Sequence, residues 1–305
     1  GKVAIGGFSP SGNTLKGARM IEENLNCKNV QVQLLDITRN GRLFHEKHSE
    51  DFLNEHVKKH DVLLIGAPVY AHHMHYNMMD VIRSLPKAEG KWSKLAVPFV
   101  TYGGISSGIA LYEAAKILKK TGRTVVSGMK INAFHVMSRL FSTHHNSGMP
   151  GEEAKPLIQE LTSRILSLSA NTCRDITRQL DYQTTKSRIK STLIFREKLW
   201  QYHFYPNLKY NEALCTGCGI CVSVCPVQRL ELQGGRISLG RNGLSCIHCT
   251  QCGYACPAGA LDFECDKEKW DRLFKKAASG KGPLPSREKP KSAVYPLELP
   301  HSIEY

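Results

Sequence analysis

The stretch that decides the organisation of this chain runs from Cys215 to Pro257. It reads Cys215-x-x-Cys218-x-x-Cys221-x-x-x-Cys225-Pro226 and then Cys246-x-x-Cys249-x-x-Cys252-x-x-x-Cys256-Pro257, so each cysteine recurs 31 residues later. Thiolates are soft metal ligands, and the two-residue spacers let three sulfur atoms converge on one site. The stretch is therefore an internal repeat of metal ligands rather than a set of scattered thiols.

This repeat resembles that of two-cluster bacterial ferredoxins, in which the fourth cysteine of each run serves the other cluster. The resemblance implies two [4Fe–4S] clusters, one on Cys215, Cys218, Cys221 and Cys256 and one on Cys246, Cys249, Cys252 and Cys225. A zinc ribbon and a disulfide framework are the alternatives. A zinc site needs four ligands, commonly two CxxC pairs, whereas the repeat supplies two sets of four, each run followed by proline. The iron–sulfur interpretation is favoured.

The composition of the chain limits its class. A length of 305 residues predicts about two domains, and 41% hydrophobic content allows a sizeable core. Eight of the 11 cysteines lie in the repeat, so the chain needs no oxidising compartment and we expect it in the cytoplasm. The sequence shows neither an apolar run long enough to span a membrane nor an export pattern at its start.

Residues 2–168 alternate between short apolar runs and helical stretches. The expected strands lie near residues 2–7, 30–36, 62–66, 95–101 and 124–130, and the expected helices near 15–25, 49–59, 78–85, 109–120 and 152–168. Such alternation predicts a doubly wound parallel sheet. Ligands of these folds bind beyond the carboxyl ends of the strands.

Three loops follow strands at that edge: the first at residues 9–14, the second at 65–71 and the third at 100–105. The first contains Ser9, Ser11, Gly12, Asn13 and Thr14 before a helix, where backbone N–H groups and the helix dipole favour a phosphate. A simple helix cap explains the same residues equally well. The loop has neither the lysine of a Walker loop nor the glycine pattern of a dinucleotide site.

The three loops together resemble those of flavodoxins, and their combination with the cysteine repeat resembles flavodoxin–ferredoxin fusion proteins. The resemblance implies a five-stranded parallel sheet in the order 2-1-3-4-5, followed by a small α+β ferredoxin-like domain with two [4Fe–4S] clusters. It places the FMN phosphate on Ser9, Ser11, Gly12, Asn13 and Thr14. It places the flavin ring near Pro68, Val69, Tyr70, Ala71, Thr101, Tyr102, Gly103 and Gly104. Pro10 departs from the flavodoxin pattern, because proline removes an N–H that could face the phosphate.

Histidines crowd the second loop. His72, His73 and His75 directly follow Tyr70 and Ala71. One hypothesis is a substrate pocket over the flavin with a histidine as proton donor, and another is a metal site. The third is that they are solvated loop residues or stack on the flavin.

The remaining segments divide the chain further. We expect domains at 1–168 and 211–263, a basic and aromatic linker at 169–210 containing a helix over 193–200, and at 264–305 a helix over 267–278 with a Pro-rich tail. Residues 171–210 carry eight Lys and Arg against three Asp and Glu within a chain of formal charge +14. This excess favours an acidic partner. No nucleic-acid motif accompanies it, so an amphipathic connector is favoured over a nucleic-acid site.

The sequence thus predicts electron transfer between two [4Fe–4S] clusters and FMN, with electrons passing to or from a redox partner such as an acidic ferredoxin or a low-potential acceptor enzyme. A ferredoxin-dependent flavin reductase acting on a small molecule in the histidine-lined pocket is the alternative, so the sequence leaves open whether the chain is itself a substrate-converting enzyme. It also leaves the oligomeric state open, a homodimer included.

Overall fold

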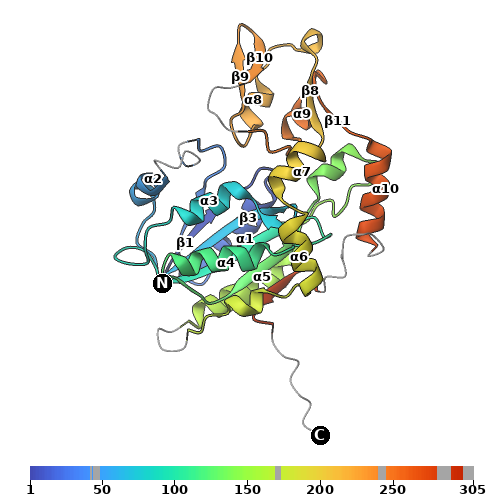
Figure 1. Ribbon diagram of the computed structural model, residues 1–305. Helices are drawn as coiled ribbons and strands as arrows, with labels where there is room; N and C mark the ends of the chain where they lie inside the picture. The colour runs from blue at the N-terminus through green and yellow to red at the C-terminus, as the bar shows by residue number, and fades with distance from the viewer. Residues whose placement is uncertain (42, 44–48, 169–172, 240–244, 280–289, 298–305) are drawn as a thin grey trace.

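In the computed structural model, a large α/β unit carries a small cysteine-rich unit at one end (Figure 1). The structure describes residues 1–305 except 42, 44–48, 169–172, 240–244, 280–289 and 298–305. Among the described helices, none combines the length and the apolar character that crossing a membrane requires.

Five parallel strands form the centre of the large unit. They are β1 (Lys2–Gly7), β2 (Gln31–Asp36), β3 (Val62–Tyr70), β5 (Leu95–Tyr102) and β7 (Gly128–Asn132). Their order is β2-β1-β3-β5-β7, and every neighbouring pair is parallel. The near-continuous apolar runs of β3 and β5 are buried, as strands covered on both faces must be. The expected 2-1-3-4-5 order is confirmed.

Helices cover both faces of this sheet. They are α1 (Asn13–Asn26), α2 (Ser49–His56), α3 (Tyr76–Arg83), α4 (Ala110–Lys120) and α5 (Lys155–Leu166). The apolar side chains of α1 and α5 share one core with the sheet, and those of α2, α3 and α4 share the other. The sheet is therefore the middle of three layers.

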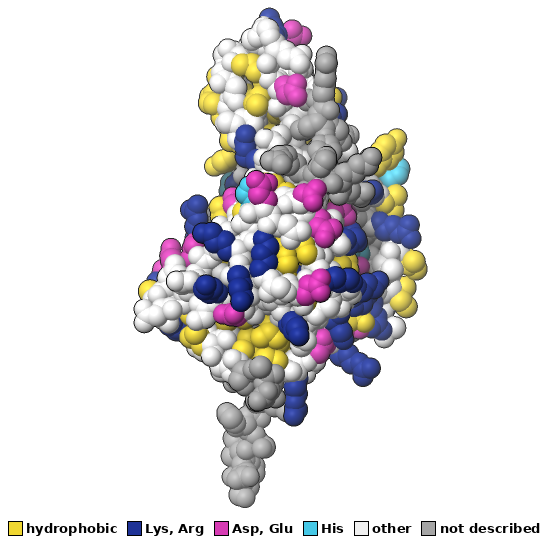
Figure 2. All heavy atoms as spheres, turned by 90° about the vertical axis from the view of Figure 1, so that its left-hand side faces the viewer, with side chains coloured by type: hydrophobic (Ala, Val, Ile, Leu, Met, Phe, Trp, Pro, Cys, Tyr) yellow, Lys and Arg dark blue, Asp and Glu magenta, His cyan; other side chains and the backbone are white. Residues whose placement is uncertain are grey.

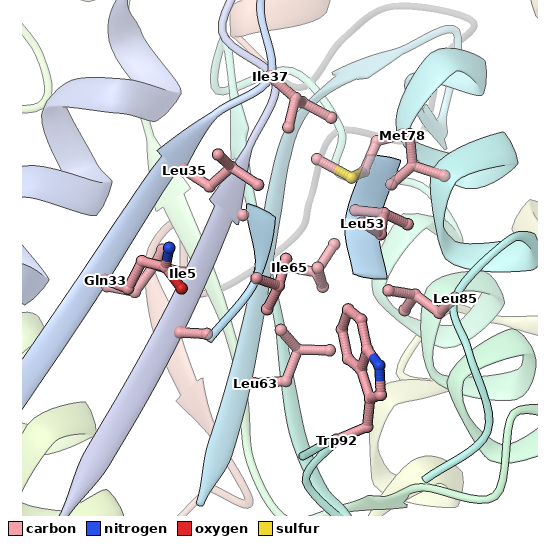
Figure 3. A pocket seen from close by; sticks show the side chains of 14 residues that line it. Ile5, Gln33, Leu35, Ile37, Leu53, Leu63, Ile65, Met78, Leu85 and Trp92 are labelled. Carbon is pink, nitrogen blue, oxygen red and sulfur yellow. The ribbon is translucent and has the colours of Figure 1, made fainter. Parts of the chain in front are cut away.

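A small void of about 20 Å³ lies in the core beneath α2 and α3 (Figure 3). Its walls are apolar side chains such as Leu63, Ile65 and Met78, with the ring of Trp92 at one end. Gln33 also lines the void, but its side-chain amide hydrogen-bonds to backbone groups of His56 and Lys58. A space of this size without polar partners stays dry, so it belongs to the packing of the core.

The sheet carries two short strands that the sequence did not predict, and the strand expected near 124–130 is divided into two. β4 (His73–Met74) folds back on β3 as a hairpin, and β6 (Thr124–Val125) is split from β7. β12 (Ala293–Tyr295), from the Pro-rich tail, pairs antiparallel with β7 and closes that edge of the sheet. Covering an edge in this way removes a row of unpaired backbone groups.

The cysteine-rich unit shows the repeat in its structure. Helix α8 (Ile220–Val224) and helix α9 (Gln251–Ala255) stand at the same offset as the cysteines, and each follows a residue in the left-handed region, Gly219 at φ 73° and Thr250 at φ 62°. Two antiparallel strand pairs flank them. These pair β8 (Asn207–Tyr210) with β11 (Leu261–Glu264), and β9 (Leu230–Gln233) with β10 (Arg236–Leu239). The small unit is α+β, as expected.

Three helices connect the two units. They are α6 (Thr185–Leu193), α7 (Glu197–His203) and α10 (Lys267–Ala278). The expected 193–200 helix is wrong: the chain breaks between α6 and α7, where Phe195 turns into the core. Helix α10 has the expected bounds.

Candidate redox site

A cavity of about 720 Å³ opens at the carboxyl ends of the parallel strands, where this architecture places its ligands. Nine of the residues expected around FMN line it: Ser11, Asn13, Pro68, Val69, Tyr70, Ala71, Thr101, Tyr102 and Gly103. Its volume lies within the range of about 300–1,000 Å³ that small-molecule sites occupy. The structure thus brings residues of all three loops to one cavity.

The four other expected FMN residues, Ser9, Gly12, Thr14 and Gly104, do not line this cavity. The Ser9 hydroxyl accepts the N–H of Leu15 at 2.8 Å, and the Thr14 and Thr101 hydroxyls join the first loop to the third at 2.7 Å. Gly12 precedes α1 at φ 87° and has no side chain to cap that helix. Ser9 takes the Leu15 N–H, so the N–H groups of Asn13 and Thr14 are the ones of the first turn that remain suited to a phosphate.

The second loop is a tight turn of unusual backbone. Tyr70 pairs with His73 across the β3–β4 hairpin, and the two residues between them, Ala71 and His72, have φ values of 44° and 70°. Two consecutive positive φ angles define the turn that suits a hairpin twist, usually with glycine or asparagine. Strain of this kind clusters at functional sites. Gly108 permits it, because a Cβ there would lie 2.1 Å from the His72 carbonyl oxygen.

The three histidines of the second loop contact α6 and α7. His72 Nδ1 lies 2.9 Å from Ser191 Oγ, and His73 Nε2 lies 2.9 Å from the Ser191 carbonyl oxygen. His75 Nε2 lies 3.3 Å from a carboxylate oxygen of Glu197. Of the three, only His72 lines the cavity. The geometry therefore gives the histidine run a positioning role, holding the connecting helices over the cavity.

The pKa values of these groups follow from their burial. Burial lowers the pKa of His72 to about 4 and that of His75 to about 3, so both rings are neutral near pH 7. Burial also acts to lower the pKa of His73, but its hydrogen bond to Glu113 at 2.7 Å outweighs this effect and the pKa is raised. Burial raises the pKa of Glu197 well above its usual value.

Aromatic side chains of the connecting helices form the roof of the cavity. The Phe195 ring stacks on His72 at 4.0 Å, and Trp200 follows at 5.0 Å from Phe195. Trp270 and Phe274 of α10 complete this side. The sequence showed the aromatic residues of 169–210 but not their position over the cavity, since the spacing of residues on a helix carries no information about which partner it covers.

The structure gathers the eight repeat cysteines in the small unit, and their assignment to two clusters stays a prediction. Cys215, Cys218, Cys221 and Cys256 line one small cavity together with Tyr210 and Ile237. Cys246, Cys249, Cys252 and Cys225 lie near one another, and their mutual charge together with burial raises the pKa of Cys252 to about 12. We call Cys215, Cys218, Cys221 and Cys256 the outer set. We call Cys225, Cys246, Cys249 and Cys252 the inner set.

The ligand chemistry of both sets, four thiols each, is the kind that a [4Fe–4S] cluster uses. Within the described residues, no three His, Cys, Asp or Glu side chains converge closely enough to hold one metal ion. Zinc would draw four sulfur atoms to about 2.3 Å from one centre, whereas each cysteine of a [4Fe–4S] cluster binds a different iron. Burial also disfavours thiolates unless positive charge is nearby, which iron would supply.

The inner set lies against the α/β unit. Cys225 and Cys249 belong to the same hydrophobic core as Phe8 and Met78, whereas Cys221 and Cys252 belong to a separate core in the small unit. Burial and the nearby Cys249 raise the pKa of Tyr70, which lines the flavin cavity. Tyr70 therefore lies between the inner set and the cavity.

Hydrogen bonds tie the inner set to the flavin loops. Gln251, two residues after Cys249, donates from its amide to the carbonyl oxygen of Pro10 in the first loop at 3.0 Å. Arg139 hydrogen-bonds the same amide group. His248, one residue before Cys249, lines the cavity itself and lies 2.7 Å from the carbonyl oxygen of Pro206. The sequence did not mark these contacts.

Comparison with known proteins supports both units. Residues 3–136 match the family model described as NADPH-dependent FMN reductase, and residues 214–260 match a 4Fe–4S dicluster domain. No curated protein matches the chain. Similar solved structures include a flavodoxin from the domain Archaea, at 18% identity and TM-score 0.34, which covers 53% of this chain and 94% of its own. Flavodoxin 1 from Bacillus cereus is 17% identical at TM-score 0.39, covering 55% of this chain and 100% of its own. An NADH:FMN oxidoreductase is 17% identical at TM-score 0.39, covering 58% and 95%.

The chain is therefore a redox protein that joins a flavodoxin-like domain to an iron–sulfur domain. It has the arrangement of the flavodoxin–ferredoxin fusion proteins, with the 4Fe–4S dicluster region after the FMN-binding type of fold, and it is built for electron transfer.

Proposed function

We propose that the chain transfers electrons between two [4Fe–4S] clusters and FMN. The outer and inner sets of cysteines would each hold one cluster, and the three loops would hold the flavin. When bound, the clusters would supply one-electron steps and FMN would accept one or two electrons. The proposed units are residues 1–168 for FMN, 169–210 as the connector, 211–263 for the clusters and 264–305 as the tail.

The observation that carries this proposal is the position of the inner set. Two of its cysteines, Cys225 and Cys249, share a core with the α/β unit, and Cys249 lies near Tyr70, which lines the proposed flavin cavity. The outer set lies farther along the small unit, with Cys218 exposed. This arrangement gives the two sets different roles, the outer one toward solvent and the inner one toward the flavin.

Metal and flavin content test the assignment of the cofactors. Anaerobically purified protein should contain about one FMN and about eight iron atoms per chain. Zinc in place of iron, or four iron atoms, would refute the two-cluster assignment.

Reduction kinetics test the order of the sites. The protein is mixed with a viologen radical, which is a one-electron reductant. The flavin should then bleach with a first-order phase whose rate is independent of protein concentration, as expected for electron transfer within one chain. Cys249→Ser should remove this phase, because it disrupts the inner set. Cys218→Ser should retain it.

The exposed Cys27 lies outside the repeat, so Cys27→Ser is the matched control and should behave as the unaltered protein. A first-order phase that survives Cys249→Ser would show that electrons reach the flavin by another route.

The external partner that we propose is a one-electron carrier protein with an acidic surface. Lys and Arg side chains gather on the visible face of the large unit, whereas the small unit shows few on that face (Figure 2). The connector adds exposed Lys186, Arg196 and Lys198. Because such interactions are steered by charge, we expect association to weaken as salt rises. The thiolate ligands require a reducing environment, so we place the protein in the cytoplasm.

The roof over the cavity favours a second candidate function, a flavin reductase acting on a small molecule. The connecting helices roof the flavin loops and leave a space lined by aromatic rings. In this function His72 is the one histidine of the second loop that reaches the cavity. Its ring is neutral near pH 7 because burial lowers its pKa to about 4, so it would orient a substrate rather than donate a proton from a charged form.

A further inference from the structure

The cavity over the flavin loops has a second wall with its own chemistry. This wall comes from α6, α7, the turn between them and α10, and its aromatic members are Phe195, Trp200, Phe204, Trp270 and Phe274. Flat rings of this kind bind planar ligands by stacking, at centroid separations of about 4.5–7 Å. The flavin loops lie on the opposite side, so the two walls enclose one space.

Two ammonium groups flank this second wall. Lys190 comes from α6 and the exposed Lys269 comes from α10, and both line the cavity. Two other cations on the same helices have acidic partners, since Arg188 pairs with Asp181 and Lys275 pairs with Asp271 at 2.7 Å. Neither Lys190 nor Lys269 has an acidic partner among the residues that the structure describes.

One acidic residue, Asp266, also lines this wall. It caps α10 by accepting the backbone N–H of Lys269 at 2.9 Å and keeps its negative charge. The phosphate of FMN does not account for the lysines, because the residues expected to hold it precede α1 on the opposite wall. With two lysines against one aspartate, the second wall therefore carries net positive charge that the flavin site does not use.

We propose that this space binds a second ligand, a planar conjugated anion, between the flavin loops and the aromatic wall. The inference rests on the proposed function only in requiring bound FMN on the opposite wall. Stacking would hold the flat body of the ligand, and Lys190 and Lys269 would pair with its carboxylate or phosphate group. The connecting helices would thus select a ligand that is both acidic and planar, with an aromatic or extended conjugated body.

Binding of aryl anions to the FMN-loaded protein tests this proposal. The charged probes are 2-naphthoate and 2-naphthyl phosphate, and 2-naphthylmethanol is the uncharged analogue. Their binding is measured by calorimetry and by the change in flavin absorption. Two partly screened ion pairs of up to about 1 kcal/mol each predict that the better anion binds about tenfold tighter than the neutral analogue. The preferred anion identifies the ligand as a carboxylate or a phosphate.

Lysine variants assign the effect to the second wall. The double variant Lys190→Met, Lys269→Met should lose about tenfold in anion affinity and leave binding of 2-naphthylmethanol unchanged. Lys186 and Lys276 lie on the same two helices but do not line the cavity. The double variant Lys186→Met, Lys276→Met is therefore the matched control and should bind the anions as the unaltered protein does.

Several results would overturn the proposal. These are equal binding of charged and neutral probes, an equal loss in the control variant, displacement of FMN by the anion, and no binding of either anion at millimolar concentration. Flavin reduction by the viologen radical is measured in the same samples. If that reduction stays intact while anion binding fails, only the second ligand is refuted, whereas its loss in the unaltered protein refutes the proposed electron transfer.

Discussion

His75 shows how one side chain can serve two elements at once. Its ring is fully buried between Phe8, Tyr70 and Tyr76, at centroid distances of 4.6–4.8 Å. Its Nδ1 accepts the N–H of Asn77 and so caps α3, while its Nε2 faces Glu197 on α7. The neutral ring suits both contacts.

Acid should destabilise the protein through this residue. Burial lowers the pKa of His75 in the folded chain to about 3, whereas an unfolded histidine titrates near 6.5. Between these values the unfolded chain binds more protons, so stability falls as the pH falls, by about 1.4 kcal/mol per pH unit for this group. His75→Asn keeps a capping side chain but removes the titration. Its melting temperature should therefore fall less than that of the unaltered protein between pH 7 and pH 5.

His144 supplies the comparison, because it is exposed. The variant His144→Asn should follow the unaltered protein across the same pH range. An identical pH dependence in the His75 variant would mean that this ring does not control acid stability.

At the scale of elements, α6 is fixed by a few buried polar groups. Ser191 is fully buried on a helix whose other side exposes Ile189 and Leu193. Its hydroxyl binds His72 and its carbonyl oxygen binds His73. The helix is therefore held over the cavity by hydrogen bonds more than by apolar packing.

Removing the Ser191 hydroxyl should loosen this helix. Ser191→Ala leaves a buried nitrogen of His72 without its partner, a change that costs about 1–3 kcal/mol. We expect FMN to dissociate faster, by roughly tenfold, because the roof of its cavity opens more often. The recovery of free FMN fluorescence after dilution measures the rate. Thr192→Ala changes the exposed neighbour and should leave the rate unchanged; equal rates in both variants would contradict a role for the hydroxyl.

The central strands and helices could be predicted because each carries its own local pattern. Residues 62–66 and 95–101 are apolar runs that only a sheet covered on both faces would bury, and the alternation with helices determines that the strands are parallel. The end of a strand carries a weaker local signal than its centre, so the prediction ended this strand at residue 66, whereas β3 continues to Tyr70. The 193–200 helix was predicted wrongly because the burial of Phe195, a tertiary contact, ends α6.

The candidate site was predictable to different extents. The cysteine spacing is a local property of two short loops, so the sequence alone could predict where the metal ligands lie. The histidines gave a signal only by their density in the second loop. Their partners Ser191 and Glu197 lie more than 100 residues away, and no spacing rule connects residues at such a distance. β12 was missed for the same reason, since a three-residue strand depends on the edge that it covers.

At the scale of the whole molecule, the tail crosses back to the flavin site. Lys291 accepts the hydroxyl hydrogen of Tyr102 with its carbonyl oxygen and donates from its Nζ to Gly104. The Tyr295 ring stacks on Tyr182 at 4.9 Å and 6°, and its carbonyl oxygen accepts the Ser127 hydroxyl at 2.7 Å. The tail therefore supports the third flavin loop from outside.

Shortening the chain tests that support. A variant ending at residue 290 loses β12 and the Lys291 contacts, so three buried residues and two hydrogen bonds to the third loop disappear. We expect a lower melting temperature and weaker FMN binding, by at least tenfold, measured by titration of the flavin-free protein. A variant ending at residue 297 keeps β12 and should match the full chain; equal FMN affinity in both shortened variants would contradict the proposed support.

The unequal exposure of the two cysteine sets has a consequence for survival in air. Cys218 of the outer set is exposed, whereas Cys225, Cys249 and Cys252 of the inner set are buried. If the two sets hold clusters as proposed, oxygen should reach the one beside the exposed Cys218 first, so damage should begin at the outer set and then reach the inner set. A briefly aerated sample should then retain about half of its iron. It should still exchange electrons between the remaining metal and the flavin. It should no longer exchange electrons with an external partner through the outer set.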